Sequence, residues 1–96
     1  MYARVPTFKI GAQDLDASIR HFEETTLPRL RELAGFKGAT VLVNRETGML
    51  RIVAYWDSRD TLQSSFEPTK ALRAEYADKL GGELVSLEEF EVAEQV

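Results

Sequence analysis

The stretch from Ala39 to Trp56 constrains the fold of this chain more than any other part of the sequence. It contains two runs rich in Val, Ile, Leu and aromatic residues, separated by the turn-forming sequence Asn-Arg-Glu-Thr-Gly. This pattern predicts a β-hairpin. If Arg45 to Gly48 form a four-residue loop, Asn44 lies opposite Met49. The residues before Asn44 then pair in order with the residues after Met49. A two-residue loop would leave the two faces unchanged, because side chains alternate across a strand.

The two faces of the predicted hairpin differ in composition. The entirely apolar face, which has to be covered, carries Ala39, Val41, Val43, Leu50, Ile52, Ala54 and Trp56. The other face is mixed and also carries much apolar surface, which in a folded protein usually marks an interface. We expect helices to cover the apolar face and a second copy of the chain to cover the mixed one. The residues expected in this dimer interface are Leu42, Met49, Arg51, Val53 and Tyr55.

The chain before the hairpin reads as a strand followed by an amphipathic helix. Residues 3–10 suit a strand in which Pro6, having no N–H, sits at a bulge or lacks one partner. Apolar residues then recur at helical spacing, beginning at Leu15 and ending at Leu33. Pro28 interrupts this pattern, so we expect a kink or break near residues 25–27.

The chain after the hairpin reads as a helical region followed by a strand. Residues 57–58 provide an N-cap, and Pro68 can begin a second helical segment that ends at residues 81–82, which are both glycine. The last strand is expected to carry Leu84 and Phe90 on one face, with a bulge near Leu87.

The resulting order of strand, helix, hairpin, helix and strand predicts one domain over residues 1–96. Right-handed crossovers place both helical regions on one side of an antiparallel four-stranded sheet, which is the ferredoxin-like βαββαβ arrangement of the α+β class. Apolar burial is worth roughly 25 cal/mol per Å², so the bare mixed face favours a symmetric dimer with the sheets face to face.

Composition excludes several functions. The net charge is −4 with acidic residues gathered near the C-terminus, which argues against a nucleic-acid partner. Cysteine is absent, so thiol chemistry and thiolate metal sites are absent too. No apolar run approaches the length of a membrane span, and the N-terminus lacks the apolar segment of a secretory signal. We therefore expect a soluble cytoplasmic protein that does not bind membranes.

Several stretches together resemble the antibiotic biosynthesis monooxygenase-like family of the dimeric α/β-barrel superfamily. They are the sequence A-G-F at 34–36, the hairpin G-A-T-V-L-V-N-R-E-T-G, and the run Y-W-D-S-R-D-T-L at 55–62. The resemblance covers nearly the whole chain. It implies a homodimer whose sheets close into a barrel, with a ligand cavity between helices and sheet in each subunit. Members include cofactor-independent monooxygenases that oxidise aromatic phenols to quinones, and haem-degrading enzymes.

The chain departs from the enzymes of this family at several positions. Ala54 stands where they often have an acidic residue, and Ser65 and Lys70 stand about where they often carry histidines. The haem degraders use an asparagine on the first strand, where this chain has Thr7 and its neighbours. These differences disfavour a haem-degrading role. Quinone formation needs only a shaped pocket, a donor to an oxyanion and access for oxygen, and no cofactor is expected.

The candidate ligand-pocket residues are aromatic. Trp56 suits either the wall of a pocket, with its indole N–H as a donor, or the core beneath the second helix. The residues expected around the same space are Phe22, Phe66 and Tyr76. His21 is the only histidine and lies off the apolar stripe, so we expect it at the surface. No metal site is expected, because no second histidine is present to join it. No catalytic residue can be assigned.

Two functions remain open at this point. The first is a cofactor-independent monooxygenase acting on a small aromatic or polyketide-like molecule held beside Trp56. The alternative is a non-catalytic ligand-binding or stress-associated homodimer that has the cavity without the chemistry.

Overall fold

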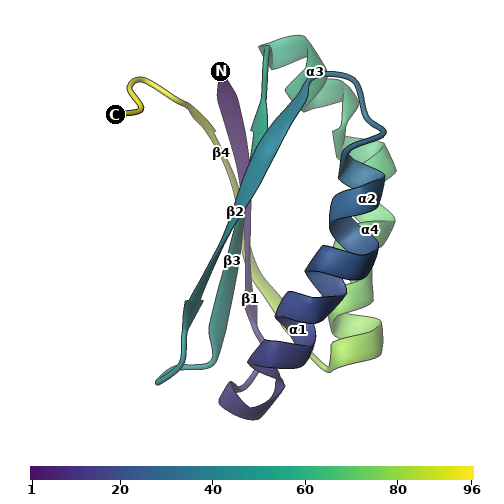
Figure 1. Ribbon diagram of the computed structural model, residues 1–96, viewed down its shortest axis with the longest axis vertical. Helices are drawn as coiled ribbons and strands as arrows, with labels where there is room; N and C mark the ends of the chain where they lie inside the picture. The colour runs from purple at the N-terminus through teal and green to yellow at the C-terminus, as the bar shows by residue number, and fades with distance from the viewer.

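The computed structural model describes residues 1–96 and has the ferredoxin-like α+β fold. Four antiparallel strands form one sheet in the order β2-β3-β1-β4. Their bounds are β1 (Tyr2–Lys9), β2 (Phe36–Asn44), β3 (Met49–Trp56) and β4 (Glu83–Glu91). All the helices lie on one side of this sheet, and its other side has no helix over it (Figure 1). None of these helices combines the length and apolar character that crossing a membrane requires.

The predicted hairpin register is confirmed. Asn44 pairs with Met49, and the ladder continues to the pairing of Ala39 with Ala54. The side-chain oxygen of Asn44 accepts hydrogen bonds from two backbone N–H groups of the loop. Gly48 closes the loop with a φ of +75°, a region that only glycine enters freely. Its carbonyl accepts the N–H groups of residues 10 and 11, which ties the hairpin tip to the end of β1.

The division into two faces is also confirmed. On the face toward the helices, every apolar residue of β3 is buried, and Leu50 and Trp56 are almost wholly inaccessible. We call the other side of the sheet the open face; it includes Leu42, Met49, Arg51, Val53, Tyr55 and Phe90. Leu42 and Phe90 are about half exposed there, at 49% and 48%. The open face therefore retains the apolar surface that the sequence predicts.

The first helical region is interrupted where Pro28 predicts a break. It consists of η1 (Ala12–Asp14), α1 (Leu15–His21), η2 (Phe22–Thr26) and α2 (Leu27–Leu30), and η2 is a single π-helical segment. Pro28 has no N–H and its ring crowds the carbonyl four residues earlier. The wider π-turn accommodates it, and the N–H of Leu27 bonds to the carbonyl of Phe22.

The second helical region consists of α3 (Arg59–Ser64) and α4 (Phe66–Leu80). Ser58 caps α3 as predicted, in a reciprocal capping box with Thr61. Pro68 does not begin α4 but lies in its first turn, where its missing N–H is not needed. Gly81 ends α4 with a φ of +66°, as expected for a left-handed C-cap.

Pro6 and β4 show how irregular pairing changes a strand. β1 lacks ladder pairs with β3 at residues 5 and 6, as the missing proline N–H predicts. The expected bulge in β4 is present, but it lies at Val85, two residues before Leu87, because the register shifts between Leu84 and Ser86. The expectation that Leu84 and Phe90 share a face is wrong, because this shift lies between them. The extra residue, Val85, reverses the alternation, so Leu84 pairs with a helix-side residue and Phe90 lies on the open face.

Tyr76 fastens α4 to the first helical region and to the sheet. Its ring stacks on Phe8 at 4.7 Å, and its hydroxyl shares a 2.9 Å hydrogen bond with the hydroxyl of Thr26. Burial raises the pKa of Tyr76 to about 12, and the charge of Glu75 adds to this while the hydrogen bond with Thr26 opposes it. Tyr76 therefore stays protonated at neutral pH.

Replacement of glycine by alanine at two positions should separate strain from crowding. Gly35 (φ +81°) and Gly81 both have positive φ, but a Cβ at Gly35 would lie 2.5 Å from atoms of Asp57 and Thr61, whereas Gly81 faces open space. We expect Gly81→Ala to lower the free energy of unfolding by about 1–2 kcal/mol and Gly35→Ala to lower it clearly more. Urea unfolding measures both, and equal losses would contradict the crowding at Gly35.

Alkaline destabilisation should trace to Tyr76. Its pKa rises from 10.0 when exposed to about 12 in the fold, so between these values the unfolded chain has released a proton that the folded chain retains. Stability therefore falls as pH rises through this window, by at most about 1.4 kcal/mol per pH unit. Urea unfolding of Tyr76→Phe between pH 9 and 12 should show a shallower fall than wild type. Tyr2→Phe serves as the control and should retain the wild-type slope.

Candidate functional site

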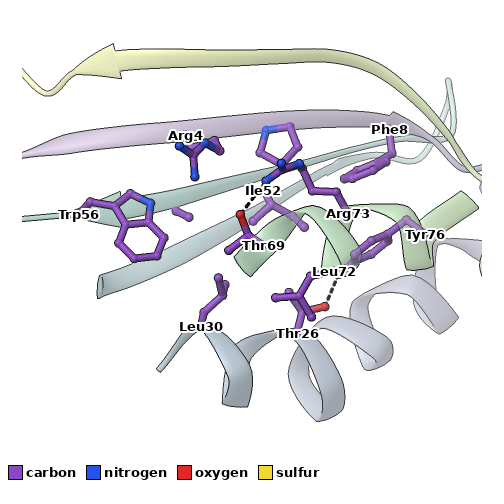
Figure 2. A pocket seen from close by; sticks show the side chains of 12 residues that line it. Arg4, Phe8, Thr26, Leu30, Ile52, Trp56, Thr69, Leu72, Arg73 and Tyr76 are labelled. Carbon is purple, nitrogen blue, oxygen red and sulfur yellow. Dashed lines mark hydrogen bonds between the residues drawn. The ribbon is translucent and has the colours of Figure 1, made fainter. Parts of the chain in front are cut away.

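A small cavity lies between the sheet and the helices, beside Trp56 (Figure 2). Its volume is about 40 Å³, and we call it the central cavity. The strands and α2 contribute mainly apolar walls. The lining residues that carry polar side-chain atoms are Arg4, Thr26, Trp56, Thr69, Arg73 and Tyr76. A cavity of roughly 10–15 Å³ can hold one water molecule, and a cavity of roughly 150 Å³ can hold a benzene-sized guest. The cavity thus admits a few waters as it stands and has to widen for an aromatic ring.

Trp56 combines both roles that the sequence allows. It ends β3, is 1% exposed and packs edge-to-face against Phe36 at 5.5 Å, so it belongs to the core. It also lines the central cavity, and its indole Nε1 is buried without a hydrogen-bond partner. Figure 2 shows that nitrogen on the side of the ring that faces the cavity. An unpaired buried donor is costly, which makes it the natural contact for an acceptor atom of a ligand.

The structure brings only two of the four expected pocket residues to the cavity. Trp56 and Tyr76 line it from opposite ends (Figure 2). Phe22 is buried in the core cluster but does not line the cavity. Phe66 does not line it either, because it begins α4 and turns outward, where 37% of it is exposed. Aromatic character alone predicts burial but not which buried ring borders a cavity.

Arg4 is a residue of the site that the sequence analysis missed. It lies on β1, pairs with Ala54 across the ladder and is 3% exposed. Its guanidinium donates to the hydroxyl of Ser65 at 2.7 Å and to the carbonyl of Leu62 at 2.6 Å. It also forms an ion pair with Glu89 at 2.7 Å. The alternation of β1 could have identified it, since Arg4 shares parity with Phe8 on the face that the helices cover.

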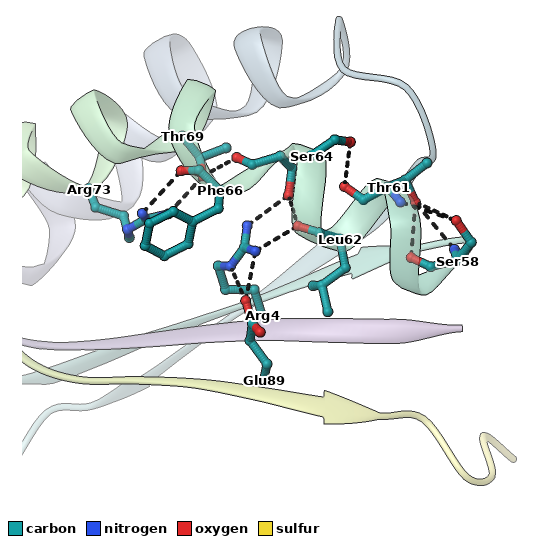
Figure 3. Close-up of polar contacts among 10 residues, drawn as sticks. Arg4, Ser58, Thr61, Leu62, Ser64, Phe66, Thr69, Arg73 and Glu89 are labelled. Atoms are coloured by element: carbon teal, nitrogen blue, oxygen red, sulfur yellow. Dashed lines mark hydrogen bonds and ion pairs between the residues drawn. The ribbon is translucent and has the colours of Figure 1, made fainter.

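Arg73 is the second arginine that the sequence analysis missed. It projects from α4 into the lining of the central cavity and donates to the hydroxyl of Thr69 at 2.7 Å. Burial lowers the pKa of Arg73, and the positive charge of Arg4 lowers it further. The two guanidinium groups both lie over the ring of Phe66, at 4.8 Å for Arg73 and 5.3 Å for Arg4 (Figure 3). Arg73 forms no salt bridge.

The expectation that His21 lies at the surface is wrong. Its side chain is only 12% exposed, and its Nε2 lies 3.2 Å from a carboxylate oxygen of Glu75 on α4. The ring also packs edge-on against Tyr76. The covered side of α1 is wider than its apolar stripe, because it includes the wholly buried Ser18, and His21 lies one turn after Ser18 and meets α4. His21 does not line the central cavity.

The polar part of the cavity consists of hydrogen-bond donors and neutral hydroxyls. The donors are the Trp56 N–H and the two guanidinium groups, and the hydroxyls belong to Thr26, Thr69 and Tyr76. Carboxylates and imidazoles are absent from the lining. Such a set can hold an oxyanion, because buried donors and positive charge stabilise developing negative charge. It cannot act by itself as a general base at neutral pH.

Comparison with other sequences gives relatives but no named family. No protein-family model matches the chain. The uncharacterized protein Rv2557 of Mycobacterium tuberculosis is 32% identical over 93 residues, covering 97% of this chain and 41% of the relative. The chain therefore spans about two fifths of the length of the curated relatives that it matches.

Comparison with solved structures gives closely similar folds. A monooxygenase from the gene ActVA-Orf6 of Streptomyces coelicolor, in complex with nanaomycin D, has a TM-score of 0.76 at 20% identity, over 99% of this chain and 89% of that one. The heme degrader MhuD of Mycobacterium tuberculosis, with two hemes bound, has a TM-score of 0.75 at 20% identity over 100% and 99%. A dimeric ferredoxin-like protein from an uncultured marine organism has a TM-score of 0.69 at 16% identity over 99% and 96%.

These similarities agree with the resemblance seen in the sequence. A further structural neighbour, from Deinococcus radiodurans, is described as an antibiotic biosynthesis monooxygenase and has a TM-score of 0.73 at 16% identity, over 100% of this chain and 96% of that one. The neighbours are thus antibiotic biosynthesis monooxygenase-like proteins with a ferredoxin-like fold, and this chain has the fold that they share.

Proposed function

We propose that the protein binds a small phenolic molecule in the central cavity and oxidises it to a quinone with molecular oxygen, without a cofactor. The observation that carries this proposal is the unpaired Nε1 of Trp56, which borders the cavity together with Arg4 and Arg73. A phenolate oxygen satisfies the orphan donor and meets the positive charge of the arginines. The monooxygenase with bound nanaomycin D among the structural neighbours gives further support.

The proposed reaction uses the cavity to stabilise negative charge. Overall, a phenol and one O₂ give a quinone and one water. One oxygen atom enters the ring, and the other leaves as water with the two hydrogens that the phenol loses. The electron-rich phenolate is the form that reduces oxygen, and buried donors favour it over the neutral phenol. Because no carboxylate or imidazole lines the cavity, the substrate releases its proton to water, and the pH dependence follows the pKa of the substrate.

The alternative is a ligand-binding protein without catalysis, belonging to a stress-associated or other homodimer. One observation favours it: the lining of the central cavity lacks a general base. The cavity of about 40 Å³ is smaller than an aromatic ring requires, so both functions need the cavity to widen. The two functions differ in whether bound phenol consumes oxygen.

We further propose that the functional unit is a homodimer joined through the open face. This face exposes Leu42 and Phe90 and leaves Met49, Val53 and Tyr55 only half-buried. Contiguous apolar surface of this kind usually marks an interface, and a two-fold pairing of the face with itself covers it in both copies. Arg51 lies on the same face and donates to the hydroxyl of Thr7. A structural neighbour described as dimeric supports this assembly.

The oxygenase proposal is tested by titrating the protein with a panel of phenols and naphthols while recording Trp56 emission and oxygen uptake. We expect saturable quenching by at least one compound and oxygen consumption faster than without protein. Trp56→Phe keeps an aromatic ring and removes the N–H, and should slow this oxidation about 100-fold. Tyr2→Phe, outside the cavity, should leave the rate unchanged.

The same experiment separates the two proposals. Saturable quenching without protein-dependent oxygen uptake would leave the ligand-binding alternative and remove the oxygenase. Blue-shifted emission unchanged by every compound would overturn both, since it would show Trp56 sealed in the core.

The dimer proposal is tested by Val53→Asp. A carboxylate at this position would be buried without a partner in the proposed interface, so association should weaken strongly while each subunit stays folded. Light scattering at micromolar concentration should give the mass of two chains for wild type and of one chain for the variant. Ala71→Asp, on the exposed side of α4, makes the same charge change elsewhere and should stay dimeric. A wild-type mass of one chain would overturn the proposal.

A further inference from the structure

A second depression adjoins the central cavity, and Arg4 belongs to both. It opens at the surface between the helices and β4, and Arg4, Gln63, Phe66, Leu87 and Glu89 bound it. We call it the Glu89 hollow. The guanidinium of Arg4 thus stands between the outside of the protein and the cavity that contains the Trp56 N–H (Figures 2 and 3).

Hydrogen bonds to the helices hold the guanidinium of Arg4 in place, independently of its ion pair with Glu89. Nη1 donates to Ser65, and Nη2 donates to the carbonyl of Leu62, both at the junction of α3 and α4. Nε and Nη2 also donate to a single oxygen of Glu89, at 2.9 and 2.7 Å. Loss of the Glu89 contact therefore leaves Arg4 oriented and frees the N–H groups that face the hollow.

Glu89 is the movable member of this contact. It comes from the edge strand β4, and 43% of its side chain is exposed, against 4% for Arg4. Its second carboxylate oxygen has no hydrogen bond within the chain. Water competes for a partly exposed carboxylate of this kind, whereas the buried Arg4 guanidinium needs an anionic partner. The Glu89 carboxylate can therefore move into solvent when another carboxylate takes its place on Arg4.

The local charge is unbalanced. Arg4 and Arg73 approach the same Phe66 ring, and Glu89 forms a salt bridge with Arg4 alone. Arg73 is partly buried, and its hydrogen bonds go to the neutral oxygens of Thr69 and of the Phe66 carbonyl. One guanidinium thus remains without an anionic partner beside a cavity that already contains an unpaired N–H.

We propose that Arg4 and Arg73 form a binding site for the carboxylate of an aromatic acid, which takes the place of the Glu89 carboxylate on Arg4. The ring of this ligand occupies the widened central cavity against Trp56, and its carboxylate remains at the edge of the Glu89 hollow. Two planar guanidinium groups suit a planar carboxylate, and the apolar lining of the cavity suits a ring. The inference deepens the proposed function and rests on it, since it specifies the substrate class as phenols that also carry a carboxylate.

The test compares benzoate with benzamide, its uncharged analogue of nearly equal shape, by the quenching of Trp56 emission. Wild-type protein should bind benzoate more tightly than benzamide, and added salt should reduce the difference. Arg73→Gln should remove the preference, and urea unfolding of this variant checks that it stays folded. Equal affinity of the wild-type protein for the two compounds would overturn the proposal.

Glu89→Gln provides the sharper test, because it weakens the internal competitor without touching the arginines. We expect it to tighten benzoate binding about twofold to fivefold, the range that partly exposed ion pairs contribute, and to leave benzamide binding unchanged. Glu88→Gln is the matched control: it makes the same change on the adjacent residue, which pairs with Val5 on the open face. Equal effects of the two variants would show general charge attraction and overturn the displacement of Glu89.

The outcome also distinguishes this inference from the proposed function. Oxidation of uncharged phenols without a preference for benzoate would retain the oxygenase and remove the carboxylate site. Selective benzoate binding without oxygen uptake by any phenol, including hydroxybenzoates, would retain the carboxylate site and leave the ligand-binding alternative.

Discussion

The packing of the helices against one face of β3 is the contact on which the rest of the structure depends. Leu50, Ile52, Ala54 and Trp56 alternate along this strand and are all buried beneath the helices, so a slip of one residue would expose all four. The same alternation forces the other side chains of β3 onto the open face. One strand thus determines both where the cavity forms and which surface is left for association.

Local rules predicted much of the fold because each relevant residue acts on its own neighbourhood. The Asn44–Gly48 turn determines the hairpin register, Pro28 produces the π-turn and Ser58 caps α3. The failures arose where the orientation of a side chain depends on the packing of whole elements. The shift at Val85 reverses the faces of β4, and α4 packs against His21 outside the apolar stripe of α1. No glycine or proline at Val85 announces the shift.

The candidate site was predicted in part, for a similar reason. Trp56 and Tyr76 were found because large aromatic residues at regular spacing mark the core. Arg4 and Arg73 were missed because charged residues are normally solvent-exposed. The burial of Arg4 depends on Ser65 and Glu89, which are distant in sequence. Arg73 bonds to Thr69 one turn earlier on α4, but it reaches the cavity only because α4 packs on the sheet. A buried arginine needs partners that only the tertiary fold assembles. The position of Arg4 and Arg73 beside the unpaired indole N–H of Trp56 is the clearest sign of function in the molecule.

The irregular pairing at Val85 couples two properties of the protein that are otherwise unrelated. Because of this one residue, Glu89 pairs with Arg4 beneath the helices while Phe90 pairs with Ala3 on the open face. In a regular strand with the same residues, Phe90 would lie on the helix side and Glu89 on the open face. Glu88 would then stand opposite Arg4, and the association surface would lose the ring of Phe90. The position of the register shift is therefore constrained jointly by the interior and by the surface, although Val85 itself is exposed and contacts neither site.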